Sequence, residues 1–170
     1  VHALMGENGA GKSTLMKILG GVTAPDTGSI EIDGVQHPAL TVAQSMQAGI
    51  AFVHQELNLF DNLDVAGNIY IGREPRRFGL LQLLDEKRLH AEVQPFLARL
   101  GATFSPATPV AELSLAQQQM VEIAKALSRD SRLVILDEPT SSLPLAETEK
   151  LLEVIAGLKA QGIAVIFISH

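Results

Sequence analysis

Four short runs of apolar residues divide the chain, each bounded by glycine, proline or polar residues. They lie at residues 1–5, 50–54, 133–137 and 163–169. Continuous apolar runs of this length are typical of strands buried on both faces of a parallel sheet. Residues 29–33 instead alternate isoleucine with polar residues before Gly34, which predicts a half-exposed antiparallel strand.

Helical patterns alternate with these strands in the outer parts of the chain. Helices are predicted at residues 12–19, 41–48 and 145–160. Gly20 and Gly21 end the first helix, while Pro144 and Gly162 suit the entrance and the exit of the last one. Strands alternating with helices predict the α/β fold class.

The middle of the chain, between Gln55 and Arg132, lacks the strand pattern. Amphipathic helices are predicted there, at residues 65–71, 86–100 and 115–129. Pro95 should break or kink the second of these, because its ring removes an amide donor and collides with the preceding turn. Residues 73–78, which contain three arginines and a proline, are expected to form an exposed loop.

Composition narrows the classes of protein that fit. The 170 residues, of which 46% are hydrophobic, are enough for one domain with a substantial core. A formal net charge of -6 argues against a nucleic-acid partner, and the absence of cysteine excludes thiolate metal sites and disulfides. The apolar runs are far shorter than the roughly 20 residues that cross a bilayer, so any membrane contact should go through a partner. Both ends fall inside apolar runs, and we expect the chain to be a fragment.

A phosphate-binding motif follows the first apolar run and opens the first helix. Gly6-Glu7-Asn8-Gly9-Ala10-Gly11-Lys12-Ser13 matches G-x-x-x-x-G-K-[ST] in the structural context that this motif requires. Glycines let backbone amides converge on phosphate oxygens, and the helix presents its positive end to the same anion. Lys12 is predicted to reach the β- and γ-phosphates of ATP and Ser13 to bind Mg²⁺. Residues 6–14, which include Thr14, are therefore candidate ATP-binding residues.

Two carboxylates end the third apolar run. Asp137 is its last residue and Glu138 follows directly. In an enzyme with a phosphate loop, a strand ending in this way supplies a metal ligand. Asp137 is predicted to hold Mg²⁺ together with Ser13, and Glu138 to act as the general base that polarises the attacking water, with Lys12 also catalytic. Carboxylates after a strand are also common at the start of ordinary loops. The pair therefore indicates a metal site only because the phosphate loop is present in the same chain.

Three further sequence features occur in a defined order along the chain, around the two motifs described above. Gln55 follows the second apolar run, Leu113-Ser114-Leu115-Ala116-Gln117-Gln118-Gln119 opens a helix, and His170 follows the last run. With them, the whole chain resembles the nucleotide-binding domain of ATP-binding cassette (ABC) proteins. The resemblance implies a P-loop NTPase core with a mainly parallel sheet, an antiparallel β portion and an inserted α-helical subdomain. It implies a core at residues 1–55 and 132–170 and a helical signature subdomain at residues 56–131, within one domain over 1–170.

The resemblance also implies roles for single residues. Gln55 looks like the lid glutamine that senses Mg²⁺ and γ-phosphate, and His170 like the switch histidine that contacts γ-phosphate; both are candidate catalytic residues. Ser114, with Gln117, looks like the signature that reaches the nucleotide on the opposite subunit, while Ser114 is equally suited to be a simple helix N-cap. The signature of the family normally has two glycines where this chain has Leu115 and Ala116.

Several stretches look most like the first cassette of bacterial monosaccharide importers, at residues 6–20, 53–59, 68–74 and 117–127. That resemblance implies an ATPase that uses ATP and Mg²⁺ and pairs with a second cassette, in the same chain or as a homodimer. It would drive transmembrane permease subunits served by a periplasmic sugar-binding protein. Its place would be peripheral, on the cytoplasmic face of the bacterial inner membrane.

Two other functions stay open. A soluble ATP-switched protein of DNA repair would need a long coiled-coil insertion, for which the 58 residues between Gln55 and Ser114 are too few. A translation factor should carry a basic linker or arm, which is absent from these residues and would have to lie beyond the ends of this expected fragment. A regulatory module that binds ATP with weak hydrolysis is favoured by Leu115 and Ala116 and opposed by Glu138 and His170.

Overall fold

The computed structural model describes residues 1–7, 9–54, 57–77, 83–141 and 143–169. The chain separates into two compact units. The first contains Val1–Gln55, Asp130–Pro139 and Leu158–His170, and the second contains Glu56–Arg129 and Thr140–Gly157. Helix α6 (Leu145–Ala160) begins in the second unit and ends in the first. The core and helical subdomain proposed from the sequence have different boundaries from these units, and that division stays a prediction.

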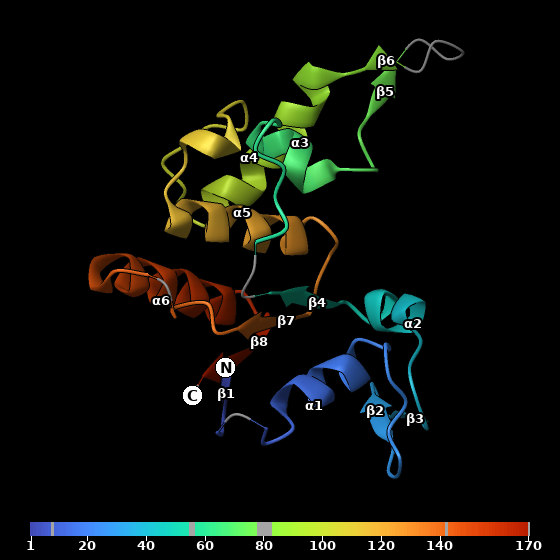
Figure 1. Cartoon of the computed structure of the whole chain (residues 1–170). Helices are drawn as coiled ribbons and strands as arrows, with labels where there is room; N and C mark the ends of the chain where they lie inside the picture. The colour runs from blue at the N-terminus through green and yellow to red at the C-terminus, as the bar shows by residue number, and fades with distance from the viewer. Residues whose placement is uncertain (8, 55–56, 78–82, 142, 170) are drawn as a thin grey trace. The chain divides into compact units, whose positions relative to one another are not determined.

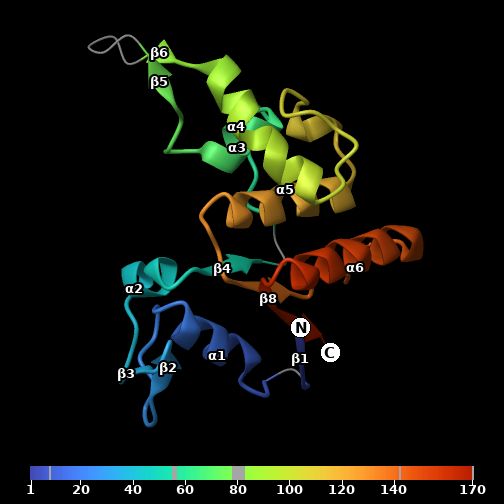
Figure 2. The same ribbon diagram turned by 180° about the vertical axis from the view of Figure 1, so that it is seen from behind.

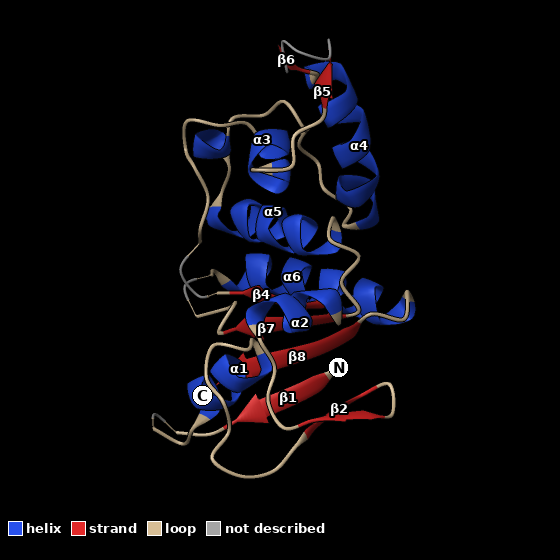
Figure 3. Ribbon diagram, turned by 90° about the vertical axis from the view of Figure 1, so that its right-hand side faces the viewer, coloured by secondary structure: helices blue, strands red, loops and turns tan. Residues whose placement is uncertain are grey.

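A parallel sheet forms the centre of the first unit (Figures 1 and 3). Within the described residues it has four strands in the order β1-β8-β7-β4. The strands are β1 (His2–Met5), β4 (Ile50–Val53), β7 (Leu133–Asp137) and β8 (Ala164–Ser169). Every neighbouring pair in this order is parallel. The prediction that the four apolar runs are strands of a parallel sheet is therefore confirmed.

Both faces of this sheet are buried at β7, whereas the edge strand β1 is largely exposed. Helix α1 (Lys12–Leu19) contributes Met16 to a buried cluster with Ile135 and Ile168, and partly buried apolar residues of α1 and of all four strands pack against that cluster. Because side chains alternate along a strand, Val134 and Leu136 face the other way, and they are fully buried too. Burial on both faces explains why the sequence of β7 is a continuous apolar run.

An antiparallel hairpin precedes β4 in the first unit. Strands β2 (Ile30–Ile32) and β3 (Val35–His37) pair across a two-residue turn in which Asp33 and Gly34 have φ of 52° and 80°. Positive φ at both positions is characteristic of the type I′ hairpin turn. The antiparallel strand predicted at residues 29–33 is confirmed, with β3 as its partner.

Polar contacts fix this hairpin and the helix that follows it. The Asp33 carboxylate accepts two hydrogen bonds from the Arg132 guanidinium, at 2.6 and 2.8 Å, and this pairing holds the pKa of Asp33 below its ordinary value of 3.8. Helix α2 (Val42–Gln47) begins with a capping box between Thr41 and Gln44. The hairpin is thus tied to the residue that precedes β7.

The second unit is mainly helical. Most of α6 belongs to it, together with α3 (Val65–Tyr70), α4 (Glu86–Arg99), the 3-10 helix η2 (Val110–Glu112) and α5 (Leu115–Leu127). Helices α3, α4 and α5 pack against one another, as two opposite views show (Figures 1 and 2). Their contacts bury apolar residues that include Val65, Ile69, Leu89, Val93, Leu97, Val121 and Ile123. Of the helices in the described ranges, none is long and apolar enough to cross a membrane.

Two predictions for this unit are wrong in part. Helix α4 continues through Pro95, so the predicted break is absent, while the predicted kink stays a prediction. Leu89, Val93 and Leu97 form one buried stripe on both sides of the proline. Packing of that stripe outweighs the loss of a single backbone hydrogen bond. The exposed loop expected at residues 73–78 is partly a strand, since β5 (Arg76–Arg77) pairs with β6 (Leu83–Leu84).

Arg73, which was assigned to the same exposed loop, makes specific contacts. Its guanidinium donates hydrogen bonds to the carbonyl oxygens of Ser128 and Ile69 and to the Ser128 hydroxyl, at 2.8 to 3.1 Å. It also lies 5.0 Å from the centre of the Tyr70 ring. Arg73 therefore ties the end of α3 to the end of α5, which its charge alone did not predict.

Candidate functional site

The turn between β1 and α1 has a backbone shape that glycine makes possible. Gly9 and Gly11 adopt φ of 85° and 89°, in the left-handed region that side chains disfavour. Gly11 is the N-cap of α1, and no side chain caps this helix start among the described residues. The amides of the first helical turn, those of Lys12, Ser13 and Thr14, therefore remain available to an anion.

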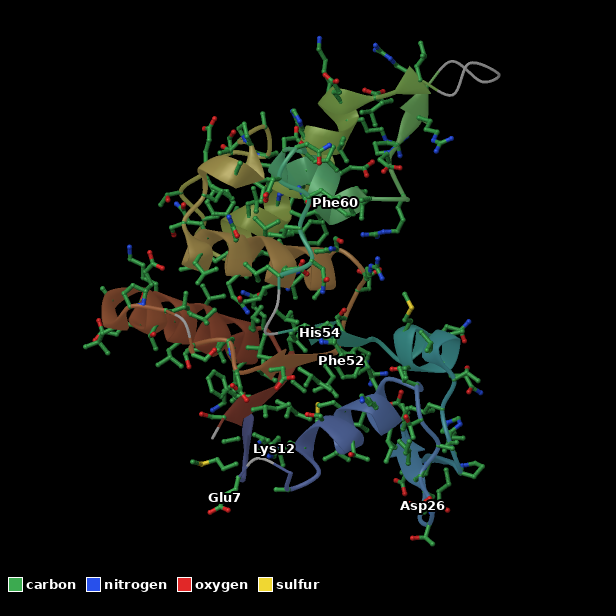
Figure 4. All side chains as sticks on the ribbon, viewed as in Figure 1. Glu7, Lys12, Asp26, Phe52, His54 and Phe60 are labelled. Atoms are coloured by element: carbon green, nitrogen blue, oxygen red, sulfur yellow. The ribbon has the colours of Figure 1, made fainter. Side chains whose placement is uncertain are left out.

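Lys12 folds back over this turn. Its ammonium donates hydrogen bonds to the carbonyl oxygens of Gly6, at 2.5 Å, and of Glu7, at 3.2 Å. Figure 4 shows Lys12 at the start of α1, close to the turn that carries Glu7. The arrangement places a positive charge beside the amides that the turn presents, which favours a multiply charged anion such as a phosphate chain.

The two carboxylates reach the same edge of the sheet. Strand β8 lies between β1 and β7 and aligns Met5 with Ser169 and Asp137 with Ile168. Because the strands are parallel, the phosphate loop after β1 and the carboxylates at the end of β7 leave the sheet on one side. Glu138 has φ of 47°, and its amide donates to the Ile168 carbonyl at 3.1 Å, so its backbone is held just beyond the strand.

These residues line one cavity of about 230 Å³. Its walls are Glu7, Gly9, Ala10, Gly11, Lys12, Ser13, Thr14, Asp137 and Glu138. That volume is below the roughly 300–1,000 Å³ of pockets that enclose whole small molecules, and it suits a phosphate chain better than a complete nucleotide. The Ser13 hydroxyl and the Asp137 carboxylate are hard oxygen donors of the kind that Mg²⁺ prefers, so the donor set fits this ion.

Other candidate residues lie elsewhere. Gly6 is absent from the described walls of the cavity but accepts the hydrogen bond from Lys12. Ser114 and Gln117 belong to the second unit, where they form a capping box at the start of α5. The Ser114 amide donates to the Gln117 side chain at 2.9 Å, and the Gln117 amide donates to the Ser114 hydroxyl at 3.4 Å. The N-cap predicted at Ser114 is confirmed, and its nucleotide contact stays a prediction.

The two departures from the signature differ in their surroundings. Leu115 is 40% exposed, whereas Ala116 is buried. Asn8, Gln55 and His170 lie outside the described residues. The sequence did not predict the left-handed backbone of Glu138 or the burial of the polar residues Asn68 and Glu122. The only local sign of that burial is that each of these two polar residues stands among apolar ones.

Known proteins show where this combination occurs. A family model described as ABC transporter matches residues 1–141. The putative ribose/galactose/methyl galactoside import ATP-binding protein 3 of Burkholderia cenocepacia (strain HI2424) is 51% identical over 170 residues, which cover the whole chain and 32% of that protein. A relative with the same description from Albidiferax ferrireducens is also 51% identical over 170 residues, covering all of this chain and 34% of its own length. The chain thus spans about a third of the length of the curated relatives it matches.

Solved structures agree with the sequence comparisons. A nucleotide-free ATP-binding cassette from an ABC transporter has a TM-score of 0.83 and 25% identity, with all of this chain and 70% of that chain covered. The cbiO1 protein of Clostridium perfringens, part of the ABC transporter complex cbiONQ, has a TM-score of 0.79 and 27% identity, with 99% and 66% covered. These likenesses confirm the P-loop NTPase fold class. By its motifs, its fold and the family match over most of its length, this chain belongs to the ABC transporter family.

Proposed function

We propose that this chain is the ATP-binding and ATP-hydrolysing cassette of a bacterial importer for a monosaccharide. One observation carries the proposal: loop amides, an ammonium, a hydroxyl and two carboxylates converge on one cavity at the carboxyl edge of a parallel sheet. The sugar class is supported by the printed names of relatives that are about half identical to the chain.

The residues that line the cavity have two roles, to bind the phosphates of ATP with Mg²⁺ and to catalyse hydrolysis. The amides of Lys12, Ser13 and Thr14 and the Lys12 ammonium bind the β- and γ-phosphates of ATP. The phosphates then replace the contacts that the ammonium makes with the loop carbonyls. The Ser13 hydroxyl and the Asp137 carboxylate would hold Mg²⁺. Bound there, the ion supplies charge neutralisation at the phosphate oxygens.

Glu138 is the proposed general base. Its carboxylate orients a water molecule toward the γ-phosphorus and takes a proton from it as the new P–O bond forms and the bond to the β–γ bridging oxygen breaks. The strained backbone of Glu138, anchored through its amide to Ile168, holds the carboxylate at the cavity. Gln55 and His170 are proposed to contact the γ-phosphate, with Gln55 also near Mg²⁺.

Partners follow from the same proposal. Ser114 and Gln117 of a second cassette would complete the site, because the N-terminus of a helix favours phosphate. The cassette would act on transmembrane permease subunits, and indirectly with a periplasmic sugar-binding protein, as a peripheral subunit at the cytoplasmic face of the membrane. The core at 1–55 and 132–170 and the helical subdomain at 56–131 belong to this proposal.

A regulatory cassette that binds ATP with weak hydrolysis is the second candidate. It is favoured by Leu115, whose partly exposed side chain stands where the family signature has glycine. A side chain there keeps the backbone of the helix start further from a phosphate. Steady-state turnover of the full-length protein with its membrane partner distinguishes the two candidates.

Calorimetry of Mg-ATP binding to the full-length protein tests the proposal. Lys12→Met should weaken binding by about 10- to 100-fold, since a hydrogen bond to a charged group contributes roughly 1.5–3 kcal/mol. Lys17→Met is the matched control, because Lys17 is an exposed lysine of the same helix. A folded wild-type protein without affinity for Mg-ATP would refute the proposed function.

A further inference from the structure

Strands β5 and β6 form a hairpin whose paired residues are all exposed. Arg76 pairs with Leu84, and Arg77 pairs with Leu83. Leu83 is 49% exposed and Leu84 is 43% exposed. Side chains that stand opposite each other in an antiparallel pair lie on the same face of it. Each face of this hairpin therefore carries one arginine and one leucine.

The base of the hairpin is fixed to the helices of the second unit. The Asp85 amide donates a hydrogen bond to the Pro75 carbonyl at 2.9 Å, directly beyond the last strand pair. Asp85 is also the N-cap of α4, where its side chain accepts from the Arg88 amide at 3.2 Å. On the side of β5, Arg73 is held by Ser128 at the end of α5. The hairpin is thus firmly attached although its paired side chains are exposed.

The leucines of the hairpin contribute little to folding. A two-stranded hairpin with both faces in water is only marginally stable, because it buries little apolar surface. Figures 1 and 2 show both strands beside the start of α4 and away from α5. Large apolar side chains next to arginines are characteristic of segments that bind at the interface of a lipid bilayer.

The charge of the hairpin is opposite to the charge of the chain. The 170 residues carry a formal net charge of -6, so an anionic surface repels the chain as a whole. Within the paired residues of β5 and β6, the charged side chains are Arg76 and Arg77. The acidic neighbour Glu74 accepts a hydrogen bond from the Gly72 amide at 2.8 Å. The hairpin is therefore a local positive charge on an acidic chain.

A phospholipid surface fits both faces of the hairpin. Guanidinium groups bind phosphate oxygens in a bidentate geometry, and leucine enters the boundary between headgroups and acyl chains. A flat protein partner would cover one face and leave the arginine and leucine of the other face in water. A layer of headgroups surrounds both faces of an inserted hairpin. Two residues of a strand span about 7 Å, within the roughly 5–10 Å to which interfacial segments enter a bilayer.

We infer that the β5–β6 hairpin is a membrane-surface contact, in which Arg76 and Arg77 bind anionic phospholipid headgroups and Leu83 and Leu84 enter the lipid layer. The inference rests on the proposed function for its place in a transporter, where it gives the peripheral subunit a direct contact with the bilayer. Each basic residue near an anionic surface strengthens binding about five-fold, so the two arginines together contribute about 30-fold. A contact of this strength is reversible and supplements the attachment to the permease.

Sedimentation of the full-length protein with lipid vesicles tests the inference. Vesicles of phosphatidylglycerol and phosphatidylcholine in equal parts should bind the wild-type protein at least about ten-fold more tightly than vesicles of phosphatidylcholine alone. Arg76→Gln with Arg77→Gln should remove this preference. Leu83→Ser with Leu84→Ser should weaken binding to the anionic vesicles by about ten-fold or more. At about 1 M salt, where the Debye length is about 3 Å, the preference of the wild-type protein should also disappear.

Matched variants on α6 separate the hairpin from general effects of the surface. Lys150→Gln with Lys159→Gln removes the same charge at two exposed lysines, and Leu145→Ser with Leu152→Ser removes two leucines that are 77% and 48% exposed. Neither pair should change vesicle binding. Because all the exchanged residues are exposed, each variant should keep the Tm of the wild-type protein. An equal loss in the α6 variants, or an unchanged preference in the arginine variant, overturns the inference.

A protein partner would give a different result. If the wild-type protein binds both kinds of vesicle equally, and the arginine variant is lost only from complexes purified with the permease, the hairpin binds a protein and the lipid contact is overturned.

The hairpin contact and the proposed function fail separately. Vesicle binding needs no nucleotide, so Lys12→Met should bind vesicles as the wild-type protein does. A wild-type protein that binds anionic vesicles but no Mg-ATP refutes the proposed function alone. A protein that binds Mg-ATP without a preference for anionic vesicles refutes the hairpin contact alone.

Discussion

Glu138 follows Asp137 directly, yet both residues line the same cavity. In a regular strand consecutive side chains point to opposite faces, and here the left-handed backbone of Glu138, with φ of 47°, ends that alternation. Such a conformation costs a non-glycine residue about 1–2 kcal/mol, and strained residues of this kind cluster at functional sites. The hydrogen bond from the Glu138 amide to Ile168 keeps it in place.

Glu138→Gln should separate binding from chemistry. The amide has the same shape as the carboxylate but accepts no proton, so Mg-ATP should still bind while turnover falls by about 100-fold or more. Phosphate release by the full-length protein measures the effect. Glu149→Gln, at an exposed carboxylate of α6, is the control and should leave turnover unchanged. Wild-type turnover in the Glu138 variant would contradict the assignment of the general base.

At the scale of elements, the β2–β3 hairpin depends on an exposed ion pair. Arg132 holds the pKa of Asp33 below its ordinary value of 3.8 by two hydrogen bonds and by its charge. A carboxylate with a depressed pKa stabilises the folded state above its ordinary pKa, and that contribution disappears as the pH falls through the depressed pKa. Acid should therefore weaken the attachment of the hairpin.

Asp33→Asn tests this dependence on pH. The wild-type protein should be slightly more stable than the variant at about pH 7, and the difference should shrink as the pH falls below 3.8 and through the depressed pKa of Asp33. Urea unfolding at about pH 7 and at a series of acidic pH values measures it. Asp26→Asn, at another exposed carboxylate of the first unit, should not reproduce this pattern. A difference that persists in acid would show that Asp33 acts through something other than its charge.

Helix α4 forms although the helix propensity of one of its residues is unfavourable. Pro95 is unfavourable inside a helix, but Leu89, Val93 and Leu97 bury a stripe that spans it. Helix α5 agrees with its sequence at its start, which the capping box of Ser114 and Gln117 marks, and it ends at Leu127, two residues before the predicted end. Local preference predicts an element reliably when packing does not oppose it.

For the whole molecule, ligand binding and stability are linked. If the cavity binds Mg-ATP only in the folded state, a ligand concentration of about 100 times Kd should raise the free energy of unfolding by about 2.7 kcal/mol. Thermal unfolding of the full-length protein should show a higher Tm with Mg-ATP, and a smaller shift for Lys12→Met. An unchanged Tm at that concentration would contradict binding to the folded state.

Local patterns were enough to predict the strands of the parallel sheet, helix α1, the phosphate loop and the two carboxylates at the end of β7. Each of these features is encoded in residues that are neighbours in sequence. Apolar runs predict strands buried on two faces, glycines allow the positive φ of the loop, and the spacing of the motif predicts an anion site. The β5–β6 pairing, the continuity of α4, the backbone of Glu138 and the hydrogen bonds of Glu122 with Asn58 and of Asn68 with Phe60 appeared only in the folded chain. They depend on contacts between residues far apart in sequence, such as Asn58 with Glu122, whose energies no local window contains.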